Sequence, residues 1–323
     1  MKEIGNTSIN FKVTEDNAVK FSEVFRSIFN IEYNKNVLNE LDYTYDIFQE
    51  FIDKYEQIDD KIKRIFIEAM CFDEITYLHN MELKRNEEKQ LVNSLAGVEI
   101  KNTSISYICD KSLKYNNIII SNIKKLHAIL MEGIALDRIK AGTFRSKDNI
   151  YVGTPVDADT IYVQYYPPLA KYIDEAMSLI ITYLNDPELN KKRPNTYLNS
   201  DIFEFDKKYA LFIQPMIIQA LLIIVQAFND GNSRTARAIN YASMLNHTNQ
   251  IFDKDYELPL LYLSRGYWGF KEQYREFLKD IAINPNSENW NKWFRFCLHS
   301  IQAHIDYYDE VINNNQLIKK KKI

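Results

Sequence analysis

The feature that most constrains the fold is a long apolar run that ends in a short polar turn. The run, LFIQPMIIQALLIIV, covers Leu211–Val225, and the turn, QAFNDGNSRTAR, covers residues 226–237. The run is shorter than the roughly 20 residues of a membrane span and contains Gln214, Pro215 and Gln219. It therefore predicts a helix buried on all sides in a helical core, with Pro215 in its first turn, and no membrane partner.

The polar turn has the layout of an anion-binding site. It leads through Gly231 into TARAINYASML, a segment without Gly or Pro that predicts a helix. Unpaired N–H groups at a helix start, together with the positive end of the helix dipole, suit phosphate. Asp230 is placed to hold a divalent cation beside that phosphate, and Arg234 and Arg237 to reach its oxygens. The alternative is that Asp230 is a helix cap and the arginines are surface charges.

The composition favours a helical protein that does not bind nucleic acid. The 323 residues include only 8 Gly and 8 Pro, and long segments of Ile, Leu, Lys, Glu and Asn run without a break. A net charge of -4 gives no general attraction to nucleic acid or to an anionic membrane. The 3 cysteines are widely spaced without a CxxC, which indicates free thiols in a reducing compartment. We therefore predict a cytoplasmic location.

Apolar residues at helical spacing predict helices along most of the chain. We expect them near residues 17–30, 37–55, 59–86, 87–96, 116–136, 168–184, 211–225, 235–247, 260–281 and 289–313. The residues before Asp16 are expected to form a loose leader. Two β-rich pieces, Asn149–Gly153 and Thr160–Tyr166, flank a turn-rich segment and predict one hairpin. The expected fold is all-α with this small hairpin, divided into an N-terminal helical region (1–112), a core (113–250) and a C-terminal helical extension (251–323).

The polar turn resembles the signature loop of the Fic family (Fic/Doc, or Fido fold), whose pattern is H-x-F-x-D/E-G-N-G-R-x-x-R. The matching positions are Phe228, Asp230, Gly231, Asn232, Arg234 and Arg237. KLHAILMEG and AGTFRSKDNIYVG, which precede the hairpin, and PPLAKYIDEAMSLIITYL, which follows it, are also similar to the family. LPLLYLSRGYWGFKEQYREFL looks like the C-terminal extension of the larger bacterial members. The resemblance implies a Fic-fold helical bundle whose hairpin flap lies within residues 145–166.

The resemblance also implies a reaction. Fic enzymes typically move AMP from ATP to a Ser, Thr or Tyr hydroxyl of a target protein, with a divalent metal such as Mg²⁺. Asp230 would be the metal ligand. The residues implied for nucleotide and phosphate binding are Gly231, Asn232, Ser233, Arg234 and Arg237. The residues implied for the flap, which aligns the target protein by strand pairing, are Ile150, Tyr151, Val152, Ile161, Tyr162 and Val163. A homodimer is left open.

The chain departs from the family pattern at the position of the general base. Gln226 stands where the family has His, Ala227 where many members have Pro, and Ser233 at the second Gly. An amide does not accept a proton near neutral pH, and losing a general base typically costs about 10²–10⁴ in rate. Three interpretations stay open: a natural member that binds nucleotide but transfers weakly or not at all, an engineered substitution, and a different base or reaction. The alternative functions are a non-catalytic partner-binding protein and transfer of a different phosphate-containing group.

Glu99 is a candidate inhibitory residue. Many family members carry an inhibitory helix, (S/T)xxxE(G/N), whose Glu pairs with the second Arg of the loop and blocks productive ATP binding. LVNSLAGVEIKNTSIS, within residues 87–106, lies at the corresponding place but departs from the pattern at Leu95 and Ile100. Because the segment lies at the corresponding place, we predict that Glu99 pairs with Arg237. The alternative is that Glu99 is a plain exposed glutamate. His127 corresponds to a structural, not a catalytic, histidine of the family.

Overall fold

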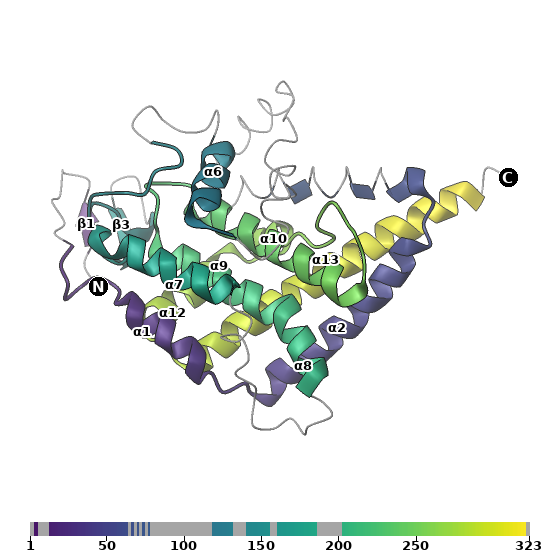
Figure 1. Cartoon of the computed structure of the whole chain (residues 1–323), viewed down its shortest axis with the longest axis horizontal. Helices are drawn as coiled ribbons and strands as arrows, with labels where there is room; N and C mark the ends of the chain where they lie inside the picture. The colour runs from purple at the N-terminus through teal and green to yellow at the C-terminus, as the bar shows by residue number, and fades with distance from the viewer. Residues whose placement is uncertain are drawn as a thin grey trace.

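The computed structural model describes residues 3–5, 13–63, 66–67, 70, 73–74, 77, 118–131, 140–155, 160–185 and 202–320. Within these residues the protein is mostly helical, with one small sheet (Figure 1). The expected mostly helical fold with a hairpin is therefore confirmed. The helices predicted at 59–86 and 87–96 lie largely or wholly outside the described residues, as does Glu99.

The helices agree with the predicted ones to within a few residues at most ends. They are α1 (Phe21–Ser27), η1 (Ile28–Asn30), α2 (Lys35–Glu56), α6 (Ile120–Leu130), η2 (Ala170–Tyr172), α7 (Ile173–Asn185), α8 (Ile202–Lys208), η3 (Tyr209–Ile213), α9 (Gln214–Val225), α10 (Asn232–Phe252), α11 (Ser264–Gly269), α12 (Lys271–Ile283) and α13 (Ser287–Lys320). The helix expected after Pro168 begins two residues later, as the short 3₁₀ turn η2, and continues as α7.

Helix α9 is the centre of the core. All 12 of its residues are buried, and α1, α7, α10 and α12 pack around it (Figure 1). The Trp293 indole on α13 also donates a hydrogen bond to the Met216 carbonyl at 3.0 Å. Among the described helices, the continuous stretch Phe205–Val225 is long and apolar enough to cross a membrane, and most of it is buried inside the fold. The prediction of a helix buried on all sides is confirmed.

The prediction that Pro215 lies in the first turn of its helix is wrong, because the helix begins earlier in the chain. Helices α8, η3 and α9 follow one another without a break, so Pro215 lies inside a long helix. Directly before it, η3 is a π-helical turn in which the Gln214 N–H bonds to the Tyr209 carbonyl. A proline inside a helix has no N–H to donate, and its ring crowds the carbonyl four residues back. The wider π turn provides the room that this proline needs.

A three-stranded sheet in the order β1-β3-β2 replaces the expected isolated hairpin. Its strands are β1 (Glu3–Gly5), β2 (Val152–Pro155) and β3 (Thr160–Tyr165), and both outer strands run antiparallel to β3. The expectation of a loose leader before Asp16 is therefore wrong at β1, which adds to the free edge of β3. Three residues are too short a stretch for alternating polarity to reveal a strand.

The first hairpin strand is shifted from its predicted place. We expected Asn149–Gly153, but β2 begins at Val152 and ends at Pro155, with an irregularity between Val152 and Gly153. Val152 lies opposite Tyr165, the last residue of β3. The prolines that soon follow β3, at 167 and 168, have no N–H for a ladder, so no strand continues there to pair with earlier residues. Ile150 and Tyr151 consequently precede the flap strand instead of belonging to it.

Candidate active site

The loop between α9 and α10 is held by two residues with left-handed backbone conformations. Gln226 ends α9 with φ of 47°, and Gly231 precedes α10 with φ of 74°. A Cβ atom at Gly231 would lie 2.5 Å from the Met131 sulfur and 3.2 Å from Nε2 of His127. Glycine is therefore required at this position both for its conformation and for space.

The Gln226 side chain stabilises the loop through two hydrogen bonds. Its Nε2 donates to the Ile223 carbonyl at 2.8 Å, and its Oε1 accepts from Nδ2 of Asn232 at 2.9 Å. A Gln amide has no basic nitrogen, so no proton acceptor near neutral pH is present at this position. Both ends of the amide instead tie the end of α9 to the start of α10.

Asn232 closes the loop from the other side. Its Oδ1 accepts from the Phe228 N–H at 2.8 Å, and its Nδ2 donates to the Phe228 carbonyl at 2.8 Å as well as to Gln226. The side-chain amide predicted to contact phosphate is thus occupied inside the loop. The contribution of Asn232 to an anion site is its backbone N–H at the first position of α10, where a helix leaves N–H groups without an intrahelical partner.

His127 supports the loop from α6. Its Nδ1 accepts a hydrogen bond from the Gly142 N–H at 2.8 Å, so Nε2 carries the proton and donates to the Asp230 carbonyl at 2.9 Å. The imidazole also stacks on Phe228 with 3.7 Å between ring centres. Burial lowers the pKa of His127 and favours the neutral ring. Every contact of this ring positions the loop, in keeping with a structural histidine.

Arg145 is a buried support that we did not predict. Its Nε donates to the Gln226 carbonyl at 2.8 Å, its backbone N–H donates to the Ala227 carbonyl at 2.9 Å, and another guanidinium nitrogen donates to the Pro168 carbonyl. Only 4% of the residue is exposed. The side chain therefore connects the loop to the segment that follows the flap. An Arg directly before a predicted hairpin was visible in the sequence, but its carbonyl partners were not.

Asp230 is the acidic group at the start of α10. Its side chain is 46% exposed, and Oδ1 accepts from the Gly231 N–H at 2.6 Å and lies 3.4 Å from a guanidinium nitrogen of Arg234. Mg²⁺ in proteins is commonly held by one or two carboxylates together with substrate phosphates and waters. A half-exposed carboxylate beside a helix start fits that arrangement. No group of three or more His, Cys, Asp or Glu residues suited to a metal occurs in the described part of the chain.

Arg237 lies in the interior of the protein. It is 0% exposed and is close enough to the buried Glu74 to lower the pKa of that carboxyl electrostatically. Glu74 also accepts from the Ser264 hydroxyl at 2.6 Å, and Ser264 contacts the Tyr241 hydroxyl at 3.1 Å. Burial outweighs these favourable contacts and raises the pKa of Glu74 to about 7. The structure thus places the predicted second anion-binding arginine in a buried network that joins α10 to α11.

A cavity of about 290 Å³, here called the loop cavity, opens over the start of α10. Its walls come from the flap region, the loop, α9 and α12. They are formed by Tyr151, Val152, Gly153, Gln164, Tyr165, Ile223, Gln226, Asn229, Asp230, Gly231, Asn232, Ser233, Tyr274, Arg275 and Leu278. Seven predicted site residues therefore meet there, whereas Arg234 and Arg237 are not among the wall residues. The seven are Tyr151 and Val152 of the predicted flap and Gln226, Asp230, Gly231, Asn232 and Ser233 of the loop. Gln164, Tyr165, Tyr274 and Arg275 were missed by the sequence reasoning.

Two further cavities adjoin the flap. One of about 990 Å³ shares Tyr151, Gln226, Asn229 and Asp230 with the loop cavity and extends along residues 140–150, so Ile150 and Tyr151 line it. The other, of about 700 Å³, lies beside β3 and is lined by Tyr162 and Val163. The predicted flap residues Ile150, Tyr151, Val152, Tyr162 and Val163 are consequently divided among different cavities.

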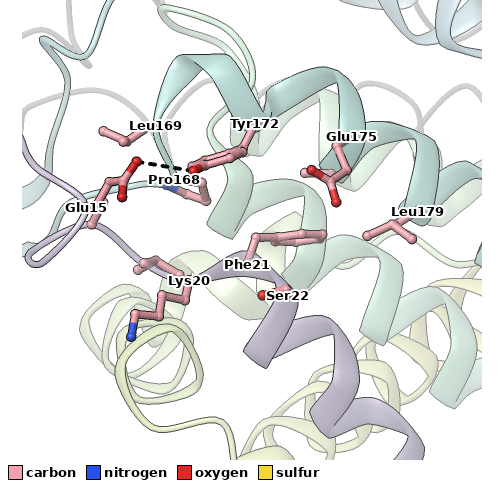
Figure 2. A pocket seen from close by; sticks show the side chains of 12 residues that line it. Glu15, Lys20, Phe21, Ser22, Pro168, Leu169, Tyr172, Glu175 and Leu179 are labelled. Atoms are coloured by element: carbon pink, nitrogen blue, oxygen red, sulfur yellow. Dashed lines mark hydrogen bonds between the residues drawn. The ribbon is translucent and has the colours of Figure 1, made fainter.

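A separate cavity of about 360 Å³ lies between residues 15–22 and the start of α7 (Figure 2). Its single carboxylate from the N-terminal segment, Glu15, is engaged by the Tyr172 hydroxyl at 3.3 Å and by Lys171. Phe21 and Leu179 contribute apolar surface (Figure 2). This cavity shares no wall residue with the loop cavity, so the predicted site residues do not meet there.

A helical bundle, a hairpin flap and a phosphate-suited loop at a helix start together define the Fic fold. Residues 117–244 match the Fic/DOC family, so this segment of the chain is similar to Fic/DOC family proteins. Two forms of Fic-1 from C. elegans have TM-scores of 0.56 and 0.53 at 18% identity, covering 84% and 86% of this chain and 71% and 73% of theirs. A Fic domain containing signaling protein from Bacteroides thetaiotaomicron has a TM-score of 0.50 at 11% identity, covering 84% of this chain and 97% of that one. No curated protein matches the chain. Identities this low show a shared fold.

Proposed function

We propose that the protein binds a nucleotide with Mg²⁺ at the start of α10 and transfers its phosphate-containing group weakly or not at all. One observation carries this proposal: the start of α10 and the Asp230 carboxylate line the loop cavity, while the position of the base holds an amide tied to Ile223 and Asn232. The site therefore retains its binding parts and lacks its proton acceptor.

The binding half of the proposal follows from the start of α10. Asn232 and Ser233 line the loop cavity in the first turn of a 21-residue helix, where N–H groups without an intrahelical partner and the helix dipole favour phosphate. Asp230 supplies one carboxylate for Mg²⁺. Because Fic family proteins typically bind ATP and Mg²⁺, we expect ATP to be the nucleotide that binds here.

The activity half follows from Gln226. Nucleotidyl transfer depends mainly on positioning and charge neutralisation, which the loop supplies, but the acceptor hydroxyl must still lose a proton. Without a general base we expect the rate to fall by about 10²–10⁴. Any residual reaction would use a Ser, Thr or Tyr hydroxyl of a target protein presented at the flap.

Calorimetric titration tests the binding half. We expect ATP to bind in the presence of Mg²⁺ and to bind at least about tenfold more weakly to Asp230→Ala, since that variant lacks the carboxylate for the metal. Asp255→Ala, which removes an exposed carboxylate away from the loop cavity, is the matched control. Absence of Mg²⁺-dependent nucleotide binding by the folded wild-type protein would exclude the proposal.

A base-restoring variant tests the activity half. Gln226→His, alone or combined with Glu99→Gly, is expected to label itself with an ATP analogue, because an imidazole can accept the hydroxyl proton. Gln226→Ala is the control, since it also removes the amide brace but provides no base. If the folded double variant binds ATP and still does not label, then more than the base is missing from the site.

A second candidate function, partner binding without catalysis, is favoured by the pairing of β1 with β3. Glu3 lies opposite Tyr162 and Gly5 opposite Thr160, so the flap edge accepts an extended segment. A protein lacking residues 1–10 should then bind a labelled peptide of that sequence, measured by fluorescence anisotropy. Equal binding by its Asp230→Ala form would support a function independent of nucleotide.

A further inference from the structure

We propose that the large cavity along residues 140–150, here called the lysine cavity, binds an acidic extended segment of the target protein, which Lys140 and Lys147 select. It is the cavity of about 990 Å³ that shares Gln226 and Asp230 with the loop cavity. The inference rests on the proposed function and adds to it the chemical class of the segment that carries the acceptor hydroxyl.

The sheet leaves the outer edge of β2 open to such a segment. In the order β1-β3-β2, strand β1 pairs with the outer edge of β3, and no described strand pairs with the outer edge of β2. Ile150 and Tyr151, which directly precede β2, line the lysine cavity, and Val152 and Gly153 of β2 line the loop cavity. An open strand edge accepts an extended peptide through backbone hydrogen bonds. A segment added to β2 therefore runs along both cavities, beside the proposed nucleotide site.

The charges on the cavity wall predict the chemistry of that segment. Among the described residues that form the wall, Lys140 and Lys147 are the cations, and Asp230, the proposed metal ligand, is the single acid. Both lysines are exposed, and within the described part of the chain neither ammonium group pairs with a carboxylate. Carboxylates of a partner therefore meet uncompensated positive charge there, although the whole chain has a net charge of -4.

Asp148, the carboxylate next to Lys147 in the chain, is bound elsewhere. Its Oδ1 accepts from the Ala170 N–H at 2.6 Å and lies 3.4 Å from a guanidinium nitrogen of Arg145. Arg145 is itself buried, so this carboxylate is held by the fold. The charge of Lys147 is consequently available to a carboxylate of an incoming segment.

The wall that carries the two lysines is fixed to the loop. Between them, the Gly142 N–H donates to His127 at 2.8 Å, and the Arg145 N–H donates to the Ala227 carbonyl at 2.9 Å. Gly142 has a φ of 75°, and a Cβ there would lie 2.9 Å from the Lys124 carbonyl oxygen, so the wall lies tightly against α6. The backbones of both lysines therefore have set places relative to the start of α10.

Peptide binding tests the charge requirement. The probes are a fluorescein-labelled peptide with one serine between glutamates, and the same peptide with glutamines in place of the glutamates. By fluorescence anisotropy at low salt, we expect the full chain to bind the acidic probe at least about tenfold more tightly, and added salt to reduce this preference. Lys140→Gln/Lys147→Gln should reduce the preference to about twofold or less, whereas Lys140→Arg/Lys147→Arg should retain it.

A charge-matched variant is the control. Lys35→Gln/Lys61→Gln removes the same net charge at two exposed positions that do not line the lysine cavity, and it should leave the preference unchanged. If both glutamine variants lower the preference equally, the effect comes from net charge alone, and the role of the cavity is overturned. Thermal unfolding of each variant establishes that the fold is retained.

Nucleotide titration separates this inference from the proposed function. Calorimetry should show that Mg²⁺-dependent ATP affinity changes by less than about twofold in Lys140→Gln/Lys147→Gln. If ATP affinity falls in this variant while the peptide preference stays, the lysines bind phosphates of the nucleotide, and the inference is wrong. If wild type binds ATP but does not prefer the acidic probe, the inference fails and the proposed function stands. If wild type prefers the acidic probe through these lysines but binds no ATP, the proposed nucleotide binding fails and the acidic docking surface remains.

Discussion

Helices α9 and α10, which flank the loop, are both largely buried but differ in how many polar residues they bury. Every residue of α9 is buried, and most are aliphatic. Helix α10 buries a series of polar side chains: Asn232, Arg234, Thr235, Arg237, Asn240, Ser243, Asn246 and Thr248. Burial of aliphatic groups stabilises the fold whatever their neighbours, whereas a buried polar group costs free energy unless a partner satisfies it.

The difference shows how the site is built. Apart from Gln214 and Gln219, which have hydrogen-bond partners, helix α9 needs only apolar neighbours of suitable volume, so it can serve as the fixed centre of the bundle. Helix α10 depends on partners from other elements: Glu74 lies close enough to Arg237 to interact electrostatically, Gln219 bonds Asn240, and His127 bonds the Asp230 carbonyl before the helix start. The position of the α10 N-terminus, and with it the proposed anion site, is therefore set by polar contacts that reach well beyond the family motif.

A large effect is expected from breaking the buried charge network of α10. At about pH 9, where Glu74 is ionised because its pKa is about 7, Arg237→Met should lower the free energy of unfolding by about 3 kcal/mol, since it leaves that carboxylate buried without a nearby cation. Chemical denaturation with urea measures this change.

The double variant Arg237→Met/Glu74→Gln is the control for this network. It should recover part of the loss, since a neutral amide no longer requires a cation. If the single variant proves as stable as wild type, the network does not position α10, and α10 does not depend on its polar partners.

A cavity in α9 tests the other side of the comparison. Leu221 is 0% exposed, and Leu221→Ala should cost about 2–5 kcal/mol in unfolding free energy, from lost burial and the remaining void. Leu221→Met, which nearly conserves volume, should cost less than about 1.5 kcal/mol. Nucleotide affinity should be unchanged in both folded variants. A selective loss of binding would instead show that α9 contributes to the site directly.

The contrast between α9 and α10 also explains what the sequence could predict. The aliphatic run at Leu211–Val225 predicts a buried helix, and Gly231 in the polar turn after it predicts the start of the next helix. The partners of polar groups depend on residues far along the chain. Neither the burial of Arg237 near Glu74 nor the contacts of Arg145 can be read from spacing. The same limit applies to β1, whose partner strand lies more than 150 residues later.

Titration of Glu74 sharpens the comparison through pH. Its folded pKa of about 7 lies above the value of 4.5 for an ordinary glutamate, so the folded protein holds this proton more tightly than the unfolded chain. Stability from Glu74 is fully present below about pH 4.5 and is lost as pH rises to about 7. We expect the unfolding free energy of wild type relative to Glu74→Gln to fall by about 2–3 kcal/mol over that window. A pH-independent difference, measured by urea denaturation from pH 5 to 8, would contradict this.

The smallest expected effect lies where α6 meets the loop. His127→Phe keeps an aromatic ring to stack on Phe228 but loses the hydrogen bonds to Gly142 and to the Asp230 carbonyl. We expect a loss of about 1–2 kcal/mol in unfolding free energy, since water can reach Asp230 and partly replace the lost donor.

The informative measurement on this variant is nucleotide affinity. Because Asp230 and the first turn of α10 lose one of their supports, Mg²⁺-dependent ATP binding should weaken about three- to tenfold. Leu221→Ala should cost more stability but should not change ATP affinity. His247→Phe is the matched control, since it alters another histidine, a partly buried one whose Nε2 contacts Gln214 at 3.0 Å away from the loop cavity. If both histidine variants weaken ATP binding equally, the loop is sensitive to any loss of stability. If only His127→Phe weakens ATP binding, the site depends on hydrogen bonds to the α10 start that come from outside the family motif.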